Sequence, residues 1–122
     1  MSELLVQNRD DVVVVQFKTS KILSEFLIAQ IARELMELAD ELADDSDGKM
    51  LLNFQGVTFM SSAMLGKIVL LKEKCKATKT TIKLCNISPV LMVAFKITKL
   101  NKGVYESEDE ALTAFQKKGW FG

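Results

Sequence analysis

Two adjacent serines, Ser61 and Ser62, stand where the sequence changes from a strand-like pattern to a helical one. The apolar run at residues 50–54 precedes them, and apolar residues at helical spacing follow from Met64 onward. The first turn of a helix has backbone N–H groups without intrahelical acceptors, and it favours negative charge. A hydroxyl here can therefore cap the helix or accept a phosphate. The residues alone leave both roles open for the two serines, and a phosphate on Thr58, three residues before Ser61, also stays open.

The composition excludes several kinds of chemistry. None of the 122 residues is histidine, so serine–histidine and cysteine–histidine nucleophile pairs cannot form, and the usual zinc patterns are missing. The acidic residues lie on predicted helix faces and turns, not as pairs on apolar elements, where acid–base catalysis would need them. Glycines are too isolated for a phosphate-binding loop. We therefore expect no enzyme activity, no metal site and no cofactor.

The charge of the chain gives little reason to expect nucleic-acid binding. Sixteen basic residues balance sixteen acidic ones, so there is no general attraction to polyanions or anionic lipids. One local group of lysines is interrupted by Glu73, and we interpret it as a solvated helix face. Its members are Lys72, Lys74, Lys76 and Lys79.

Both cysteines and the hydrophobic segments are typical of a cytoplasmic protein. Cys75 and Cys85 do not form a CxxC motif, and reduced, buried thiols are the default for such residues. The longest aliphatic runs, at residues 12–15 and 68–71, are far too short to span a bilayer. The N-terminal residues lack the basic and apolar regions of a signal peptide. We expect no contact with a membrane.

The order of elements predicts a single α/β domain over residues 1–122. Expected strands lie at residues 4–7, 12–17, 49–54, 80–85 and 104–105, and helices begin near Ser24, Ser62, Ser88 and Ser107. Four consecutive valines in the second strand indicate burial on both faces. Strands alternating with helices predict a mixed, mostly parallel sheet of four to five strands with about four helices.

An acidic segment at residues 44–48 resembles a calcium-binding loop only superficially. The first acidic ligand of such a loop would fall on Ala43, and the closing glutamate would fall on Phe54. We interpret the segment as a solvated turn after the first helix.

Several motifs together resemble the STAS domain family, and most closely its bacterial anti-sigma factor antagonists. The apolar strand at residues 51–54 and the segment from Gly56 to Ser62, followed by Leu65-Gly66, resemble an apolar strand and the loop gly-val-x-phe-(ile/met)-asp-ser-(ser/thr)-gly-leu-gly. Residues 86–90 resemble the family's asn-x-ser-pro helix start, and residues 110–112 resemble its last helix. The resemblance covers nearly the whole chain in the same order.

This resemblance implies a phosphorylation switch at Ser62, the position that follows the family aspartate. In the family a partner serine kinase, which often doubles as the anti-sigma factor, phosphorylates this serine, and a serine phosphatase resets it. The unphosphorylated antagonist binds the kinase and frees the sigma factor. The expected partner-binding residues surround Ser62: Thr58, Met60, Ser61, Ala63, Met64 and Gly66.

Two residues depart from the family pattern. Ser61 stands at the aspartate position and Met64 at a glycine position. An alternative therefore stays open, in which the domain is an unphosphorylated scaffold in a bacterial signalling assembly. Homodimer formation also stays open, because an unpaired edge of the first strands would permit it.

Overall fold

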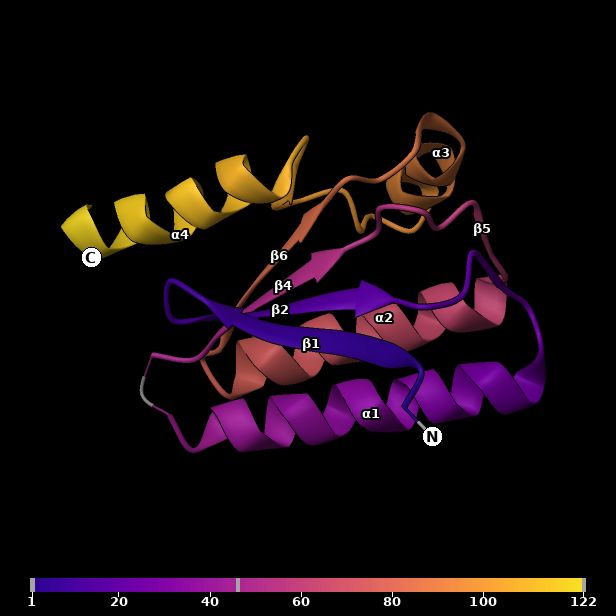
Figure 1. The fold of residues 1–122 in the computed structure, drawn as a ribbon, viewed down its shortest axis with the longest axis horizontal. Coiled ribbons are helices and arrows are strands. Elements are labelled where there is room, and N and C mark those ends of the chain that lie inside the picture. The colour runs from indigo at the N-terminus through magenta and orange to yellow at the C-terminus, as the bar shows by residue number, and fades with distance from the viewer. Residues whose placement is uncertain (1, 46, 122) are drawn as a thin grey trace.

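The computed structural model describes residues 2–45 and 47–121. It shows a five-stranded mixed sheet with helices on both faces (Figure 1). The strand order is β1-β2-β4-β6-β7, with β1 antiparallel to β2 and the remaining neighbours parallel. The strands are β1 (Leu4–Arg9), β2 (Val12–Phe17), β4 (Lys49–Asn53), β6 (Thr81–Cys85) and β7 (Val104–Tyr105). The helices are α1 (Glu25–Ala43), α2 (Ser62–Ala77), α3 (Pro89–Ile97) and α4 (Glu108–Phe121). The predicted fold class is confirmed.

Strand β2 is covered on both faces, as its valines predict. Val15 and Phe17 belong to the main core, which the sheet shares with α1, α2 and α3. Val12 and Val14 belong to a smaller core on the opposite face, under α4. Alternate residues of a strand point to opposite faces, so a run of valines suits a strand with apolar cover on each side.

The hairpin between β1 and β2 is tighter than the sequence suggests. The predicted polar turn covers residues 8–11, but β1 continues to Arg9 and only Asp10 and Asp11 form the turn. Their φ angles are +53° and +67°. Positive φ at both positions is typical of a type I′ hairpin turn, and aspartate tolerates this conformation better than most residues.

Serine caps begin the first and third helices, as expected. Ser24 Oγ accepts a hydrogen bond from Leu27 N at 3.1 Å, and Ser88 Oγ accepts one from Leu91 N at 3.3 Å. Apolar residues of α1 recur at spacings of three and four, which predicts one buried stripe through Leu42. Ile28, Ile31 and Leu35 are buried as predicted, but Leu38 and Leu42 are only partly buried, and Ala39 is the last fully buried position.

A second, two-stranded parallel sheet was not expected from the sequence. It pairs β3 (Lys21–Ile22) with β5 (Phe59–Met60). Two-residue strands carry no recognisable periodicity, and their pairing joins segments far apart in the chain. This small sheet lies directly before α2 and fixes the point at which that helix begins.

Helix α1 ends at Ala43, and Asp44 and Asp45 after it are exposed, as the interpretation of a solvated turn predicts; Ser46 lies outside the described residues. Within the described part of the chain, no group of three or more cysteine, aspartate or glutamate side chains is placed to hold a metal ion. None of the described helices has the length and apolar character that crossing a membrane requires.

Candidate functional site at the start of helix α2

A type II turn leads the chain from β4 toward the two serines. Val57 N donates to Phe54 O at 2.9 Å, and Gly56 between them has φ +87°. Position i+2 of this turn requires positive φ, which glycine adopts without a steric cost. The side chain of Asn53, only 2% exposed, accepts from Gln55 N at 2.9 Å and so braces the turn.

Asn53 also ties this turn to the other end of the sequence. Its Nδ2 donates to Glu108 Oε1 at 2.9 Å, and Glu108 forms an ion pair with Arg9 of β1. Burial raises the pKa of the nearby Cys85 thiol to about 12, and the negative charge of Glu108 adds to this effect. Cys75 and Cys85 are both buried and free, as expected. The turn before the serines is therefore held by β1, β4 and α4 together.

Strand β3 holds the segment that enters α2. Thr58 N donates to Ser20 O at 2.8 Å, and the Thr58 hydroxyl donates to the same carbonyl at 3.2 Å. Ser61 N donates to Ile22 O at 3.1 Å. Thr58 is exposed, but its hydroxyl is engaged by the backbone of the neighbouring segment. This pairing fixes the helix start relative to the sheet.

The two serines have different roles. Ser61 has extended backbone angles (φ −71°, ψ 163°), and its Oγ accepts from Met64 N at 3.3 Å, so Ser61 is the N-cap of α2. Ser62 is the first helical residue and is exposed. Within the described residues, its hydroxyl has no hydrogen-bond partner. The sequence left capping and a free hydroxyl as alternatives for each serine; in the structure Ser61 is the cap and Ser62 has the free hydroxyl.

The electrostatic environment of Ser62 favours an anion. The backbone N–H groups of Ser62 and Ala63 have no acceptor among the described residues, because the cap takes only the N–H of Met64 and the Ser61 carbonyl takes that of Leu65. The first turn of α2 contains no acidic residue. Unpaired N–H groups and the helix dipole together favour negative charge at this end.

Met60 and Met64 are core residues, contrary to their expected place on the partner-binding surface. Their exposed fractions are 4% and 0%, and both pack in the main core. The reason is periodicity: Met60 points inward from β5, and Met64 shares the buried face of α2 with Ile68 and Leu71. Met64, at the family glycine position, therefore fills the core and does not cover Ser62.

Exposed apolar side chains that the sequence analysis missed lie beside this helix start. Phe59 of β5 is 46% exposed, and Leu23 and Phe26, which follow β3, are 52% and 85% exposed. Phe59 and its neighbour Met60 point to opposite sides of β5, and no sequence signal indicated which of them would be exposed, because a two-residue strand shows no periodicity. Large exposed apolar groups gathered in one region typically mark an interaction surface.

The exposed face of α2 continues this surface. The sequence of this helix is apolar over much of its circumference, which predicts that it is largely covered. In the structure Ala63 and Gly66 are exposed, and Leu70, one turn farther, is 50% exposed. A Cβ added to Gly66 would meet nothing within 4 Å. The chain itself therefore gives no steric reason for glycine at this position.

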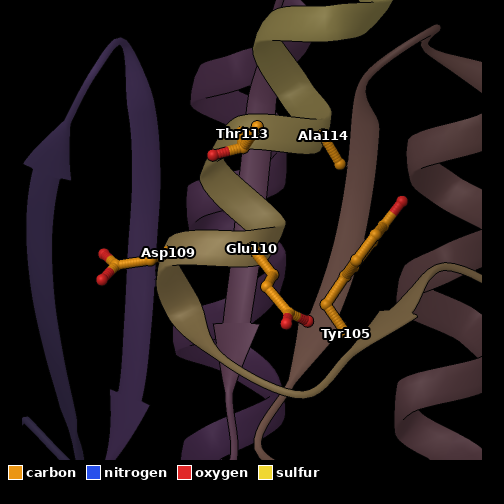
Figure 2. Close-up of a pocket in the computed structure, with 5 residues that line it drawn as sticks. All are labelled: Tyr105, Asp109, Glu110, Thr113 and Ala114. Carbon is orange, nitrogen blue, oxygen red and sulfur yellow. The ribbon is translucent and has the colours of Figure 1, made fainter.

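The larger hollows of the surface lie away from the serines. One of about 550 Å³ is lined by Tyr105 and the first turns of α4. Figure 2 shows Glu110 and Ala114 on the side of Tyr105, while Asp109 points away toward the β1–β2 hairpin. None of the predicted site residues lines this hollow, so the candidate site is the exposed surface around Ser62.

Comparison with known protein families identifies the fold. The family model described as the STAS domain matches residues 4–111. The chain belongs to the STAS domain family. A comparison with curated proteins finds no significant match.

Solved STAS structures share this architecture at low sequence identity. An anti-sigma-factor antagonist (STAS) domain protein from Planctomyces limnophilus has a TM-score of 0.78 and 23% identity, covering 94% of this chain and 98% of its own. Bacillus SpoIIAA in its phosphorylated form has a TM-score of 0.70 and 18% identity, with coverage of 91% and 97%. The murine anion transporter Slc26a9 has a TM-score of 0.64 and 16% identity, covering 91% of this chain but 18% of its own. These similarities establish the STAS fold.

Proposed function

We propose that this protein is a cytoplasmic anti-sigma factor antagonist that binds an anti-sigma factor with serine kinase activity. Phosphorylation of Ser62 ends that binding, a serine phosphatase restores it, and sigma-factor-dependent transcription responds. The observation that carries the proposal is the exposed, unbonded hydroxyl of Ser62 at a helix start that has free N–H groups. The fold that the chain shares with a phosphorylated antagonist supports it.

The proposed partner surface consists of the exposed residues around Ser62. It includes Thr58, Phe59, Ala63 and Gly66, with Ser61 at its border. Met60 and Met64 support this surface from the core and do not contact the partner. Leu23 and Phe26 add apolar area next to it.

A phosphate on Ser62 can act without a large conformational change. It would add about −1.5 to −2 charge at neutral pH, which the helix start tolerates. A partner docked on the surrounding apolar side chains would have to desolvate this dianion, at a cost of several kcal/mol without a matching cation. Because each ~1.4 kcal/mol is a factor of ten, a loss of about 3 kcal/mol weakens binding more than a hundredfold.

Ser61 at the family aspartate position is compatible with this switch. Serine and aspartate cap helices about equally well, so the helix start is preserved. Serine removes a negative charge from the residue next to the phosphate. The phosphorylated form should therefore be less strained by like-charge repulsion here than with aspartate.

The proposal is tested by phosphopeptide mass spectrometry on the protein isolated from its native cells, with and without stress. We expect a phosphate on Ser62 whose occupancy changes with conditions. The kinase that co-purifies with the protein is then titrated with each variant in a calorimeter. Ser62→Ala should bind this kinase, and Ser62→Asp should bind it at least a hundredfold more weakly. An unmodified Ser62 under every condition, or equal binding by both variants, would refute the switch.

A second candidate function is an unphosphorylated STAS module that holds a signalling assembly together through fixed contacts. The replacement of the family aspartate by Ser61 favours it, because the charge that helps to organise the loop in that family is absent. This role predicts that Ser62→Asp leaves partner binding unchanged.

A further inference from the structure

The two edges of the main sheet carry opposite charges. At one edge, β1 and α1 form a groove of about 210 Å³ lined by apolar residues and by three glutamates, Glu34, Glu37 and Glu41. On the side of the sheet opposite β1, where the edge strand β7 pairs only with the end of β6, α2 and β6 form a groove of about 580 Å³ lined by four lysines, Lys72, Lys76, Lys79 and Lys83. We call these the glutamate edge and the lysine edge. Figure 1 shows β1 and β6 on opposite sides of the sheet, with α1 and α2 in one layer beneath it.

The glutamates project from one side of α1 and remain available for an external partner. Glu37 and Glu41 are exposed and have no ion-pair partner among the described residues. Burial alone would raise the pKa of Glu34, but hydrogen bonds from Ser2, the Glu3 backbone and Gln30 lower it overall, so this carboxylate stays ionised. Two cations of this part of the chain contact uncharged groups: Lys18 donates to Ser2 O at 2.9 Å, and Arg33 donates to Gln30 at 2.6 Å.

The lysine edge contains more cationic than anionic side chains. Burial and the neighbouring Lys102 lower the pKa of Lys72, whose Nζ donates to the Lys102 carbonyl at 3.2 Å. Lys76 and Lys79 are exposed, and no described carboxylate pairs with either. Glu73 is the one acidic residue that lines this groove. Four lysines line this groove against one glutamate, but the Lys83 ammonium donates to the Tyr105 hydroxyl at 3.3 Å and lies 5.3 Å from the centre of the Phe115 ring. The positive charge available to a partner therefore comes mainly from Lys76 and Lys79.

Unpaired backbone also faces outward at both edges. Lys18 N donates to Glu3 O at 3.2 Å, so the backbone N–H and C=O groups of the odd-numbered residues of β1 point toward β2. The backbone groups of the even-numbered residues Val6 and Asn8 therefore point away from the sheet. On β6, Leu84 N donates to Gly103 O at 2.8 Å, which places the outward-facing groups on even residues. Strand β7 pairs only with Leu84 and Cys85. Beyond its end the Ile82 N–H faces outward, whereas the Ile82 carbonyl lies beside Gly103, where an added Cβ would be 3.8 Å from that oxygen. Unpaired strand edges are templates for pairing with another chain.

We propose that the glutamate edge of one molecule binds the lysine edge of a second copy, head to tail. In a copy placed in the same orientation, α1 lies beside α2 in one layer, and β1 runs antiparallel to β6 where β6 extends past the end of β7. Glu37 and Glu41 then lie next to Lys76 and Lys79. A contact between two different surfaces of the same chain produces open-ended assemblies unless a rotation closes a ring.

The charges select this arrangement over a two-fold dimer through β1. Such a dimer would bring Glu37 and Glu41 against the same residues of the second copy, and like charges placed opposite one another oppose association. In the head-to-tail arrangement each interface joins opposite charges. The chain carries no formal net charge, so long-range repulsion does not oppose it. This contact leaves the start of α2 uncovered and is independent of the proposed function.

Sedimentation velocity of the full chain tests the proposal. At about 10 mM ionic strength, where the Debye length is ~30 Å, the weight-average mass should rise with concentration without a plateau at twice 13.6 kDa. At about 1 M, where the Debye length is ~3 Å, the protein should be monomeric. Glu37→Lys/Glu41→Lys and Lys76→Glu/Lys79→Glu should each abolish self-association.

Mixing the two variants gives the decisive measurement. One carries lysines at both edges and the other glutamates at both, so a one-to-one mixture should assemble although neither does so alone. Circular dichroism checks that both fold, and Lys67→Glu/Lys96→Glu, whose charges lie outside both edges, should associate like the wild type.

Three results would overturn the proposal. One is a wild-type protein that stays monomeric at low ionic strength at every concentration up to about 1 mM. Weak contacts act at effective concentrations of this order when they are linked in one assembly. Another is a plateau at the dimer mass that is insensitive to Lys76→Glu/Lys79→Glu, which would indicate two-fold pairing through β1. The third is a monomer whose lysine edge instead binds a fluorescent single-stranded oligonucleotide, with loss of that binding in the lysine variant.

Discussion

Replacing Ser61 by alanine should destabilise the domain, whereas replacing Ser62 should not. The Ser61 hydroxyl accepts from Met64 N at 3.3 Å and caps α2. The Ser62 hydroxyl is exposed, with no protein partner among the described residues. The two substitutions remove the same atom from adjacent positions, so they are matched controls for each other.

The expected size follows from this single hydrogen bond. Loss of a serine N-cap typically costs about 1 kcal/mol. Helix α2 is covered by α1 and contributes Met64, Leu65, Ile68, Leu71 and Cys75 to the core, so its first turn cannot unfold separately without exposing Met64 and Leu65. Ser61→Ala should therefore lower global stability by about 1 kcal/mol, or Tm by roughly 3–5 °C for a domain of this size. Ser62→Ala should change the free energy of unfolding by less than about 0.5 kcal/mol.

Urea unfolding followed by circular dichroism measures both values. With a slope of roughly 1–2 kcal/mol per molar, Ser61→Ala should move the midpoint down by about 0.5–1 M at unchanged slope. Ser61→Asp should restore the midpoint, because aspartate caps a helix as well as serine does. Equal losses in both alanine variants, or a larger loss at Ser62, would show that the roles of the two serines are assigned incorrectly.

Three further predictions concern the glycines and the thiols. Gly66→Ala should raise the free energy of unfolding by about 1 kcal/mol, because a Cβ there meets nothing within 4 Å; thermal unfolding measures this, and a lower Tm would contradict it. Gly56→Ala should lower stability by about 1–2 kcal/mol, because φ +87° disfavours a side chain; an unchanged urea midpoint would contradict it. Cys75 and Cys85 should react with Ellman's reagent at pH 8 only after denaturation, because burial raises the pKa of both thiols; rapid labelling of the native protein would refute this. The pKa of the Cys85 thiol is about 12 in the folded protein, so as pH rises the unfolded chain loses the thiol proton first. The stability that the protonated thiol contributes is therefore complete below about pH 9 and is lost as pH rises toward 12.

Much of the main sheet could be predicted from local patterns. The valines of β2, the helix caps Ser24 and Ser88 and the apolar stripe of α1 each reflect forces within a few residues of chain, and the structure confirms them. The motif at residues 56–66 indicated the correct family and the correct helix. Where the sequence analysis failed, the deciding contacts are non-local or depend on the phase of a short element.

The surface around Ser62 shows this limit most clearly. Met60 and Met64 are flexible apolar residues, and sequence alone could not decide whether they face the core or a partner; the pairing of β5 with β3 and the packing of α2 buried both. The same pairing left Phe59 exposed.

By itself the sequence determined that this is a STAS-type α/β domain with two hydroxyls at the start of its second helix. Only the tertiary structure decided that Ser61 caps the helix and that the Ser62 hydroxyl is exposed, without a partner among the described residues. The tertiary structure also decided where the charges of the two helices lie. The glutamates of α1 and the lysines of α2 form no distinctive motif in the sequence, but the fold places them on opposite sides of the domain. The physical reason is that a helix cap depends on backbone angles fixed by distant pairing, and a charged edge depends on which helix covers which strand.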